Sequence, residues 1–309
     1  MFNPNSLTFM KTTDKTVKGK NSRQNPVFMD LTNDYAFKLV FATPGHEEAL
    51  LQLVRCLLPE KDIVSVQLSA QEQMSDTEKL RRGIYDVSCQ TAAGDYLEIE
   101  MQVRKQNDFG DRMVFYSSFP VRNFVGKLDS GLEYAFTPIY VIGILDFIMS
   151  DVMPNDRFMN SYSIRNDFQH EILLSDHLHF ITIELPKFQK SLEELENSTD
   201  ELAFIFNNIG KMNEIPPILR NKGFEKMFEM SKFAAMDEKE IIEYYARQKD
   251  IIDLKGALSS ARRDGLEEGR EKGHAEEKHS IAKAMKAKGI SADIIQQCTG
   301  LSEAEIQAL

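Results

Sequence analysis

The segment that decides the fold is residues 84–103, IYDVSCQTAAGDYLEIEMQV, in which two runs of alternating apolar and polar residues flank residues 91–95, TAAGD. Alternation with a period of two is typical of a strand that buries one face. Two such runs joined by a short segment that contains glycine predict a β-hairpin.

Two registers of this hairpin are open, and side-chain alternation decides between them. A two-residue turn at Ala93-Gly94 would place Asp86 opposite the apolar Met101. A three-residue loop that ends on Gly94 in the left-handed conformation is a common hairpin form, and it places Asp86 opposite Glu100. Only the three-residue loop keeps polar and apolar side chains on separate faces, because a slip of one residue would bury the carboxylates. We therefore predict the three-residue loop.

The polar face of this hairpin carries Asp86, Glu98, Glu100 and Gln102. Directly opposed residues have Cβ atoms ~5 Å apart, and like charges in such positions destabilise a sheet. A divalent cation would compensate them, and carboxylate oxygens together with water suit Mg²⁺ or Mn²⁺. The alternative is a face that is simply exposed to solvent, where acidic residues cost little.

The flanking sequence predicts a mixed α/β sheet with helices on its faces. Helical spacing of apolar residues follows Thr32 or Asn33, either of which can cap a short helix. The order along the chain is helix, strand, strand, strand, helix, strand, which favours this architecture. We predict further helices at 46–58 and 108–128, and strands at 63–68, 84–90, 96–103, 138–147, 160–166, 169–174 and 179–185.

The rest of the chain divides by composition. Dense Glu, Lys and Arg with sparse apolar residues predict a long solvated helical arm. Near the end, Gly300 can terminate one short helix, and Ser302 with Glu305 forms a capping box for another. We predict a flexible tail at 1–30, an α/β core with extra strands at 31–190, a helical subdomain at 191–236, the arm at 237–288 and a small helix pair at 289–309.

Composition excludes several classes of protein. The three cysteines, Cys56, Cys89 and Cys298, lie far apart without CxxC spacing, which argues against a disulfide framework or a zinc knuckle. No run approaches the ~20 apolar residues of a membrane span, so we expect a cytoplasmic protein without membrane contact. The net charge of −11 argues against a protein that coats nucleic acid, although local contacts to phosphates stay open.

The hairpin also resembles a known pattern. Asp86, thirteen residues, then Glu100-Met101-Gln102 resembles the PD-(D/E)XK nuclease signature, with glutamine in the lysine position. Together with residues 33–38, NDYAFK, it is similar to the Rpn family of recombination-promoting nucleases, which are transposases of the PD-(D/E)XK type. The resemblance implies a restriction-endonuclease-like α-β-β-β-α-β core with a helical C-terminal extension. It covers 31–150 and the C-terminal tail.

This resemblance implies Mg²⁺-dependent cleavage of DNA. Asp86 and Glu100 would hold the metal, which would lower the pKa of a bound water and polarise the scissile phosphate. Gln102 would orient the water by hydrogen bonding, without the charge of the usual lysine.

Several neighbouring residues are candidates for supporting roles. An acidic residue from the early helices often completes such a site, and Asp34, Glu47 and Glu48 remain open alternatives. Glu98 shares the polar face, and Lys38 is either a site residue or a solvated surface lysine. Positive charge that would meet DNA phosphates comes from Arg81, Arg82, Arg104, Lys105, Arg112 and Arg122, with Tyr116 one helical turn after Arg112.

Two other functions compete with cleavage. One is an inactive DNA-binding or transposition accessory protein with the same fold. The other is an assembly protein whose arm pairs with a partner helix, with a homodimer as one form, although the arm lacks a convincing heptad seam.

Overall fold

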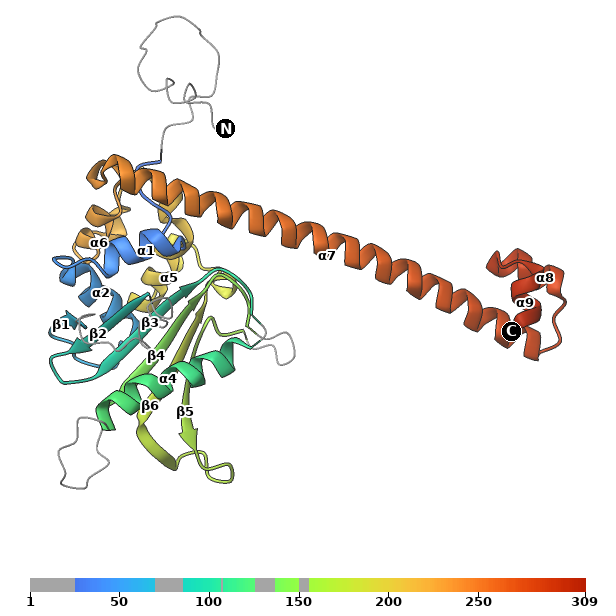
Figure 1. Cartoon of the computed structure of the whole chain (residues 1–309), viewed down its shortest axis with the longest axis horizontal. Coiled ribbons are helices and arrows are strands. Elements are labelled where there is room, and N and C mark those ends of the chain that lie inside the picture. The colour runs from blue at the N-terminus through green and yellow to red at the C-terminus, as the bar shows by residue number, and fades with distance from the viewer. Residues whose placement is uncertain (1–25, 70–85, 107, 126–136, 150–155) are drawn as a thin grey trace, which may run out of the picture.

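The computed structural model describes residues 26–69, 86–106, 108–125, 137–149 and 156–309. A mixed sheet with the strand order β1-β2-β3-β4-β6-β5 forms the centre of the molecule (Figure 1). The strands are β1 Val66–Leu68, β2 Val87–Thr91, β3 Tyr96–Gln102, β4 Ile139–Leu145, β5 Met159–Arg165 and β6 Leu173–Glu184.

The strand directions explain the mixed character of the sheet. β1, β2 and β3 are successively antiparallel, β4 runs parallel to both β3 and β6, and β5 returns antiparallel to β6. The crossover from β3 to β4 contains helix α4, Phe109–Val125. Helices α1, Asp34–Phe41, and α2, Glu47–Leu57, precede the strands. The predicted α/β fold with the order α-β-β-β-α-β is therefore confirmed.

One face of the sheet packs on the main hydrophobic core. Val87, Cys89, Leu97, Ile99 and Met101 all point into it, as the alternation of the hairpin predicts. The same core contains buried residues of α1, α2, α5 (Ser198–Asn208) and α6 (Glu225–Met230). Each large apolar side chain buried there contributes about 1.5–3 kcal/mol. The hairpin is thus fixed by its apolar face.

The opposite face packs on α4. Ile139, Val141 and Leu145 of β4 form a second, smaller core with Phe109 and Met113 of this helix. All seven residues of β4 are buried, as a nearly continuous apolar run predicts for a strand covered on both faces. The covering helix turns the polar face of β3 into an interior surface.

Three predicted strands differ from the observed ones. β1 begins at Val66 rather than at residue 63, the predicted strand at 169–174 does not form as such, and the strand predicted at 179–185 begins already at Leu173. Instead Ile172 N donates to Gln169 O in a turn, and β6 then runs unbroken from Leu173. Local alternation cannot separate a turn from a strand when both carry apolar residues.

The main core also includes residues that precede the predicted core domain. Phe28 and Met29 are buried in the main core, and Phe28 forms a β-bridge with Lys232. We had assigned residues 26–30 to the flexible tail, and their side chains show that this boundary was wrong. Residues 1–25 of that predicted tail lie outside the described residues.

Helix α7, Glu238–Ala287, leaves the core as a projecting arm (Figure 1). At a rise of 1.5 Å per residue its 50 residues span about 75 Å. At its far end α8, Ala292–Thr299, and α9, Glu303–Ala308, pack on it around Ala282 and Ile295. Within the described ranges, no helix is both long enough and apolar enough to cross a membrane.

The predicted stop and start signals of this terminal helix pair are confirmed. Gly300 ends α8 in the left-handed conformation with φ +73°, and Ser302 and Glu305 form the capping box of α9. Local capping chemistry therefore determines where α8 ends and where α9 begins.

Candidate active site

The hairpin has the predicted three-residue loop. Thr91 N donates to Asp95 O at 2.9 Å, Gly94 has φ +93°, and Ser88 is paired with Glu98. A residue with a side chain would be strained at this φ, so glycine is the residue this loop requires. Continued by two residues, the register places Asp86 opposite Glu100.

A backbone contact fixes Asp86 against the neighbouring strand. Its Oδ2 accepts a hydrogen bond of 2.7 Å from Met101 N, the residue that follows Glu100. Asp86 is thereby held beside Glu100, as the register analysis predicts. The two carboxylates that we expected to act together are brought together.

The polar face is buried, so the alternative of a solvent-exposed face does not apply. Glu98 is 4% exposed and Glu100 is 7% exposed. Burial disfavours the charged forms, raising the pKa of Glu100 to about 7 and that of Asp86 above its usual range. The negative charge of Asp86 raises the pKa of Glu100 further. The site therefore holds acidic groups where negative charge is costly.

Two cationic side chains compensate the pair. Lys38 Nζ of α1 lies 2.9 Å from Asp86 Oδ1, and Arg112 Nη2 of α4 lies 2.6 Å from Glu100 Oε1. Both cations lower the pKa of the carboxyl group that each one contacts, against the effect of burial. Without a metal, ion pairs across the site thus supply the compensation that the sequence led us to expect from a divalent cation alone.

Arg112 is itself held in place by two neighbours. Its Nε donates to Tyr116 OH one helical turn later, and its Nη1 donates to Gln106 Oε1. Arg112, one of the cations expected to meet DNA phosphates, therefore lies against the carboxylates of the site. Tyr116 is mostly buried and contacts the site through this arginine.

Glu98 lies deeper on the same face. Its carboxylate accepts a hydrogen bond from Ser88 Oγ, and Tyr96 contacts it as well. Burial raises its pKa to about 8. Ser88 was not among the residues singled out from the sequence, although the predicted register already placed it opposite Glu98.

Gln102 lies at the end of β3, where the site opens to solvent. Its Nε2 donates to Arg104 O at 3.3 Å, and its backbone oxygen accepts from Asp146 N at 3.0 Å. Gln102 and Asp34 both line a hollow of about 140 Å³ at this edge of the sheet. The third residue of the signature is thus at the mouth of the site.

Of the three candidates for an additional carboxylate, the structure brings only Asp34 to the site. Asp34 is the first residue of α1, after the capping residue Asn33, and its charge raises the pKa of Asp86. Glu47 accepts from Gly45 N at 3.2 Å, and the exposed Glu48 lies near Lys226. Both belong to the first turn of α2.

The other predicted cations divide into two groups. Arg104, Lys105 and Arg122 are exposed near the hairpin and α4. Arg81 and Arg82 lie outside the described residues. One further contact was not predicted: Lys255 of α7 reaches Asp146 across 109 residues of chain.

The donor set fits a metal ion that accepts few protein ligands. In the described part of the chain, no three His, Cys, Asp or Glu side chains are arranged to hold a metal. Mg²⁺ keeps several waters and is usually bound by one or two carboxylates together with substrate phosphates. Asp86 and Glu100 supply two carboxylates, and a dication would relieve the cost of burying their charge. The residues present therefore fit Mg²⁺ or Mn²⁺.

Comparison with known proteins agrees with this arrangement. Residues 31–261 match the PD-(D/E)XK nuclease family transposase, and residues 275–309 match the Rpn/YhgA-like nuclease family C-terminal HTH domain. No curated protein and no solved structure matches the chain. The first match covers the sheet, the site and the beginning of α7, and the chain belongs to the family of PD-(D/E)XK nuclease transposases.

Proposed function

We propose that the protein is a DNA endonuclease that depends on Mg²⁺ or Mn²⁺ and acts in recombination or in the movement of mobile elements. The observation that carries this proposal is the buried opposition of Asp86 and Glu100, each paired with a cation. A purely structural sheet gains little from two facing carboxylates, because like charges in opposed positions are destabilising. Family membership supports the same reaction class.

In this proposal Asp86 and Glu100 hold the metal. A divalent cation supplies a water of lowered pKa and a polarised phosphate. The Met101 amide fixes the orientation of Asp86, and the positive charge of Arg112 favours the ionised form of Glu100 against the effect of burial. Both carboxylates are therefore preorganised before metal or DNA arrives.

Lys38 and Gln102 divide the role of the signature lysine. Gln102 orients the attacking water by hydrogen bonding, and it carries no charge. Lys38 brings an ammonium group to Asp86, and its side chain is 43% exposed, so it can move to meet developing charge on the phosphate. The acidic Asp34 lies close enough to add a carboxylate, directly or through water.

Nicking of supercoiled plasmid tests the proposal. Wild type should cleave with Mg²⁺ or Mn²⁺ and not with a chelator, and Asp86→Ala or Glu100→Gln should lower the rate by about 10²-fold or more, the range expected for loss of a metal-held water. Glu48→Gln is the matched control, because it removes an exposed carboxylate of α2. Cleavage that survives both site variants would refute the assignment.

A second function is an accessory protein that binds DNA without cutting it. The uncharged Gln102 and the match of residues 275–309 to an HTH domain favour it. Unchanged DNA affinity in Asp86→Ala, with no cleavage by wild type under any metal, would select this function. Residues 289–309 contain no Lys or Arg, so that helix pair offers little charge for a major groove.

Two further properties belong to the proposal. DNA is the expected partner, and size-exclusion chromatography tests whether the chain forms a homodimer through its arm. We place the activity in the cytoplasm.

A further inference from the structure

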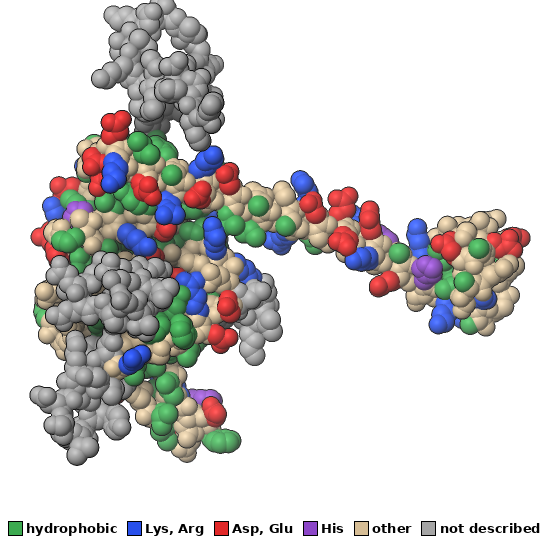
Figure 2. Space-filling model, in the orientation of Figure 1, with side chains coloured by type: hydrophobic (Ala, Val, Ile, Leu, Met, Phe, Trp, Pro, Cys, Tyr) green, Lys and Arg blue, Asp and Glu red, His purple; other side chains and the backbone are tan. Residues whose placement is uncertain are grey.

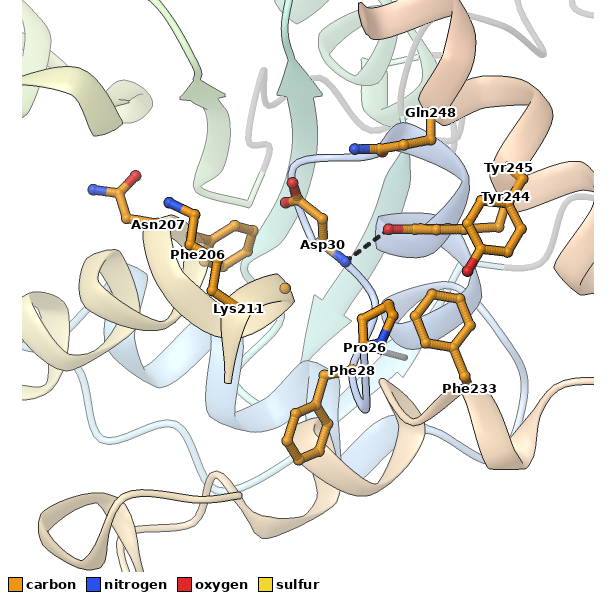
Figure 3. Close-up of a pocket in the computed structure, with 11 residues that line it drawn as sticks. Pro26, Phe28, Asp30, Phe206, Asn207, Lys211, Phe233, Tyr244, Tyr245 and Gln248 are labelled. Carbon is orange, nitrogen blue, oxygen red and sulfur yellow. Dashed lines mark hydrogen bonds between the residues drawn. The ribbon is translucent and has the colours of Figure 1, made fainter. Parts of the chain in front are cut away.

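The base of α7 is fixed against the candidate site. Asn33 Nδ2, next to Asp34, donates to Gln248 Oε1 at 3.0 Å and contacts Tyr244 O at 3.4 Å. Tyr244 OH accepts from Asp30 N at 3.0 Å, so the start of α7 is tied to the segment before α1 (Figure 3). These contacts make the first turns of α7 a wall of the core, although the helix continues outward as an arm.

A second attachment lies at the carboxyl end of β4. Lys255 Nζ is 2.6 Å from Asp146 Oδ2, and Asp146 N donates to the backbone of Gln102. Between the two attachments, α7 passes the end of the hairpin. It therefore carries side chains to the place where Gln102 meets solvent.

A hollow of about 140 Å³ lies between the hairpin and this wall. A site for one water needs ~10–15 Å³ by the same measure, so the hollow has room for a phosphate group. The residues that line it are Asp34, Met101, Gln102, Val103 and Arg104 on one side and Arg247, Asp250, Ile251 and Leu254 of α7 on the other.

Two arginines are the cations of this hollow. Arg104 follows the hairpin, and Arg247 comes from α7 with a half-exposed side chain and only a long 3.7 Å contact to Glu243. Guanidinium groups bind phosphate through paired N–H donors. Figure 2 shows Lys and Arg side chains on the core surface beneath the base of α7. Within the described residues, the long contact to Glu243 leaves the guanidinium group of Arg247 able to turn toward a ligand.

Two carboxylates, Asp34 and Asp250, line the same hollow. Their charge balances that of the two arginines, which weakens the hold on a free anion. A DNA strand is affected less, because it is held at several phosphates at once. The chemistry therefore favours a phosphate that belongs to a polymer.

We propose that this hollow is a phosphate subsite in which Arg247 and Arg104 hold a DNA backbone phosphate next to the scissile one. The subsite rests on the proposed function, since it places DNA across Asp86 and Glu100. It makes the base of α7 part of the DNA-binding surface, and it gives the arm a role at the site itself.

DNA affinity in the absence of metal tests the subsite separately from cleavage. Full-length wild type, Arg247→Gln and Arg263→Gln are titrated with a labelled duplex in chelator, over a range of salt, by fluorescence anisotropy. Arg263 is the matched control: it lies on α7 with its side chain 75% exposed, 16 residues and about 24 Å further along the helix.

We expect Arg247→Gln to weaken binding about three- to tenfold and to make the slope of log K against log salt shallower by about 0.9, the value for one lost phosphate contact. Arg263→Gln should stay within about twofold of wild type. Arg104→Gln should weaken DNA binding by a similar factor. The variant that carries both substitutions should lose less affinity than the product of the two single fold-losses, because both guanidinium groups hold the same phosphate.

An Arg247→Gln protein with the affinity and salt slope of wild type would overturn the subsite, as would a wild type that binds no duplex. If binding depends on Arg247 while no metal supports cleavage, the subsite stands and the nuclease proposal fails. If wild type cleaves and Arg247→Gln binds normally, the nuclease proposal stands and the subsite fails.

Discussion

At the scale of single residues, the ionisation of Glu98 affects the stability of the folded state. It lies on the interior polar face with Ser88 as its hydrogen-bond partner, and burial raises its pKa from 4.5 to about 8. A carboxyl group with a raised pKa in the folded state stabilises the protein below its unfolded pKa. That contribution is lost as pH rises toward 8, because the unfolded chain releases the proton more readily.

Glu98→Gln should remove this pH dependence. In metal-free buffer, wild type should lose stability relative to the variant between pH 5 and pH 8, by on the order of a few kcal/mol in the free energy of unfolding. Glutamine keeps an acceptor for Ser88 and never ionises. Urea denaturation at several pH values measures the difference in the free energy of unfolding. If the free energies of wild type and Glu98→Gln change with pH in parallel across this range, the raised pKa of Glu98 is contradicted.

The sequence predicts part of this residue-scale chemistry. Alternation and Gly94 are local features, and they sufficed to place Asp86 opposite Glu100. The partners of these carboxylates were not predictable in the same way, because Lys38 and Arg112 reach them from two helices packed on opposite faces. Which lysine or arginine contacts a carboxylate depends on how the helices pack, and no local sequence pattern predicts that packing.

At the scale of elements, the packing of α4 on β4 depends on Gly143. A Cβ atom at this position would lie 2.8 Å from Cε1 of Phe109, so the ring occupies the space above the glycine. Gly143 is the neighbour of Glu100 in the β3–β4 pairing, and Arg112 is one turn after Phe109. The glycine thus sets how closely α4, with its arginine, approaches the site.

Gly143→Ala should therefore destabilise the fold by about 1–3 kcal/mol, the range for overpacking a core, and should lower cleavage by displacing Arg112. Thermal denaturation and the plasmid assay measure the two effects. Gly110→Ala is the control, because Gly110 lies in α4 with no atom within 4 Å of the added Cβ. Alanine there should leave the melting temperature unchanged or raise it, since glycine costs a helix about 1 kcal/mol. Equal melting of both variants would argue against this packing.

Helices whose side-chain pattern is clear along their whole length were predicted close to their observed bounds. The arm expected at 237–288 is α7, Glu238–Ala287, and the helix expected at 108–128 is α4, Phe109–Val125. The structure of residues 166–172 was not predicted correctly, because their apolar side chains, including that of the 96% exposed Phe168, do not mark a buried face. Composition alone gives no way to tell an exposed apolar turn from a strand.

At the scale of the whole molecule, α7 belongs to both the core and the arm. Tyr244 is 4% exposed in the main core, whereas the helix beyond residue 258 is exposed until Ala282 contacts the terminal helices. The family match ends at 261, close to the point where α7 leaves the core. The division we predicted at 236 separates residues that pack together here.

Two shortened chains test this. A chain that ends after residue 261 should melt within a few degrees of full length, because it keeps the contacts of Tyr244, Gln248 and Lys255. A chain that ends after residue 235 should melt clearly lower, since burial of one large aromatic side chain alone contributes about 1.5–3 kcal/mol. If both chains melt alike, the base of α7 contributes nothing to the core.

We propose that Asp86 and Glu100 form a divalent-metal site, and the binding of Mn²⁺, followed by electron paramagnetic resonance, is the measurement that decides it. At pH 8, above the pKa of about 7 for Glu100, wild type should bind Mn²⁺, and Asp86→Asn and Glu100→Gln should each weaken that binding at least about tenfold, as loss of a charged ligand predicts. Glu48→Gln should bind as wild type does. Equal Mn²⁺ affinity in wild type and both site variants would contradict the claim.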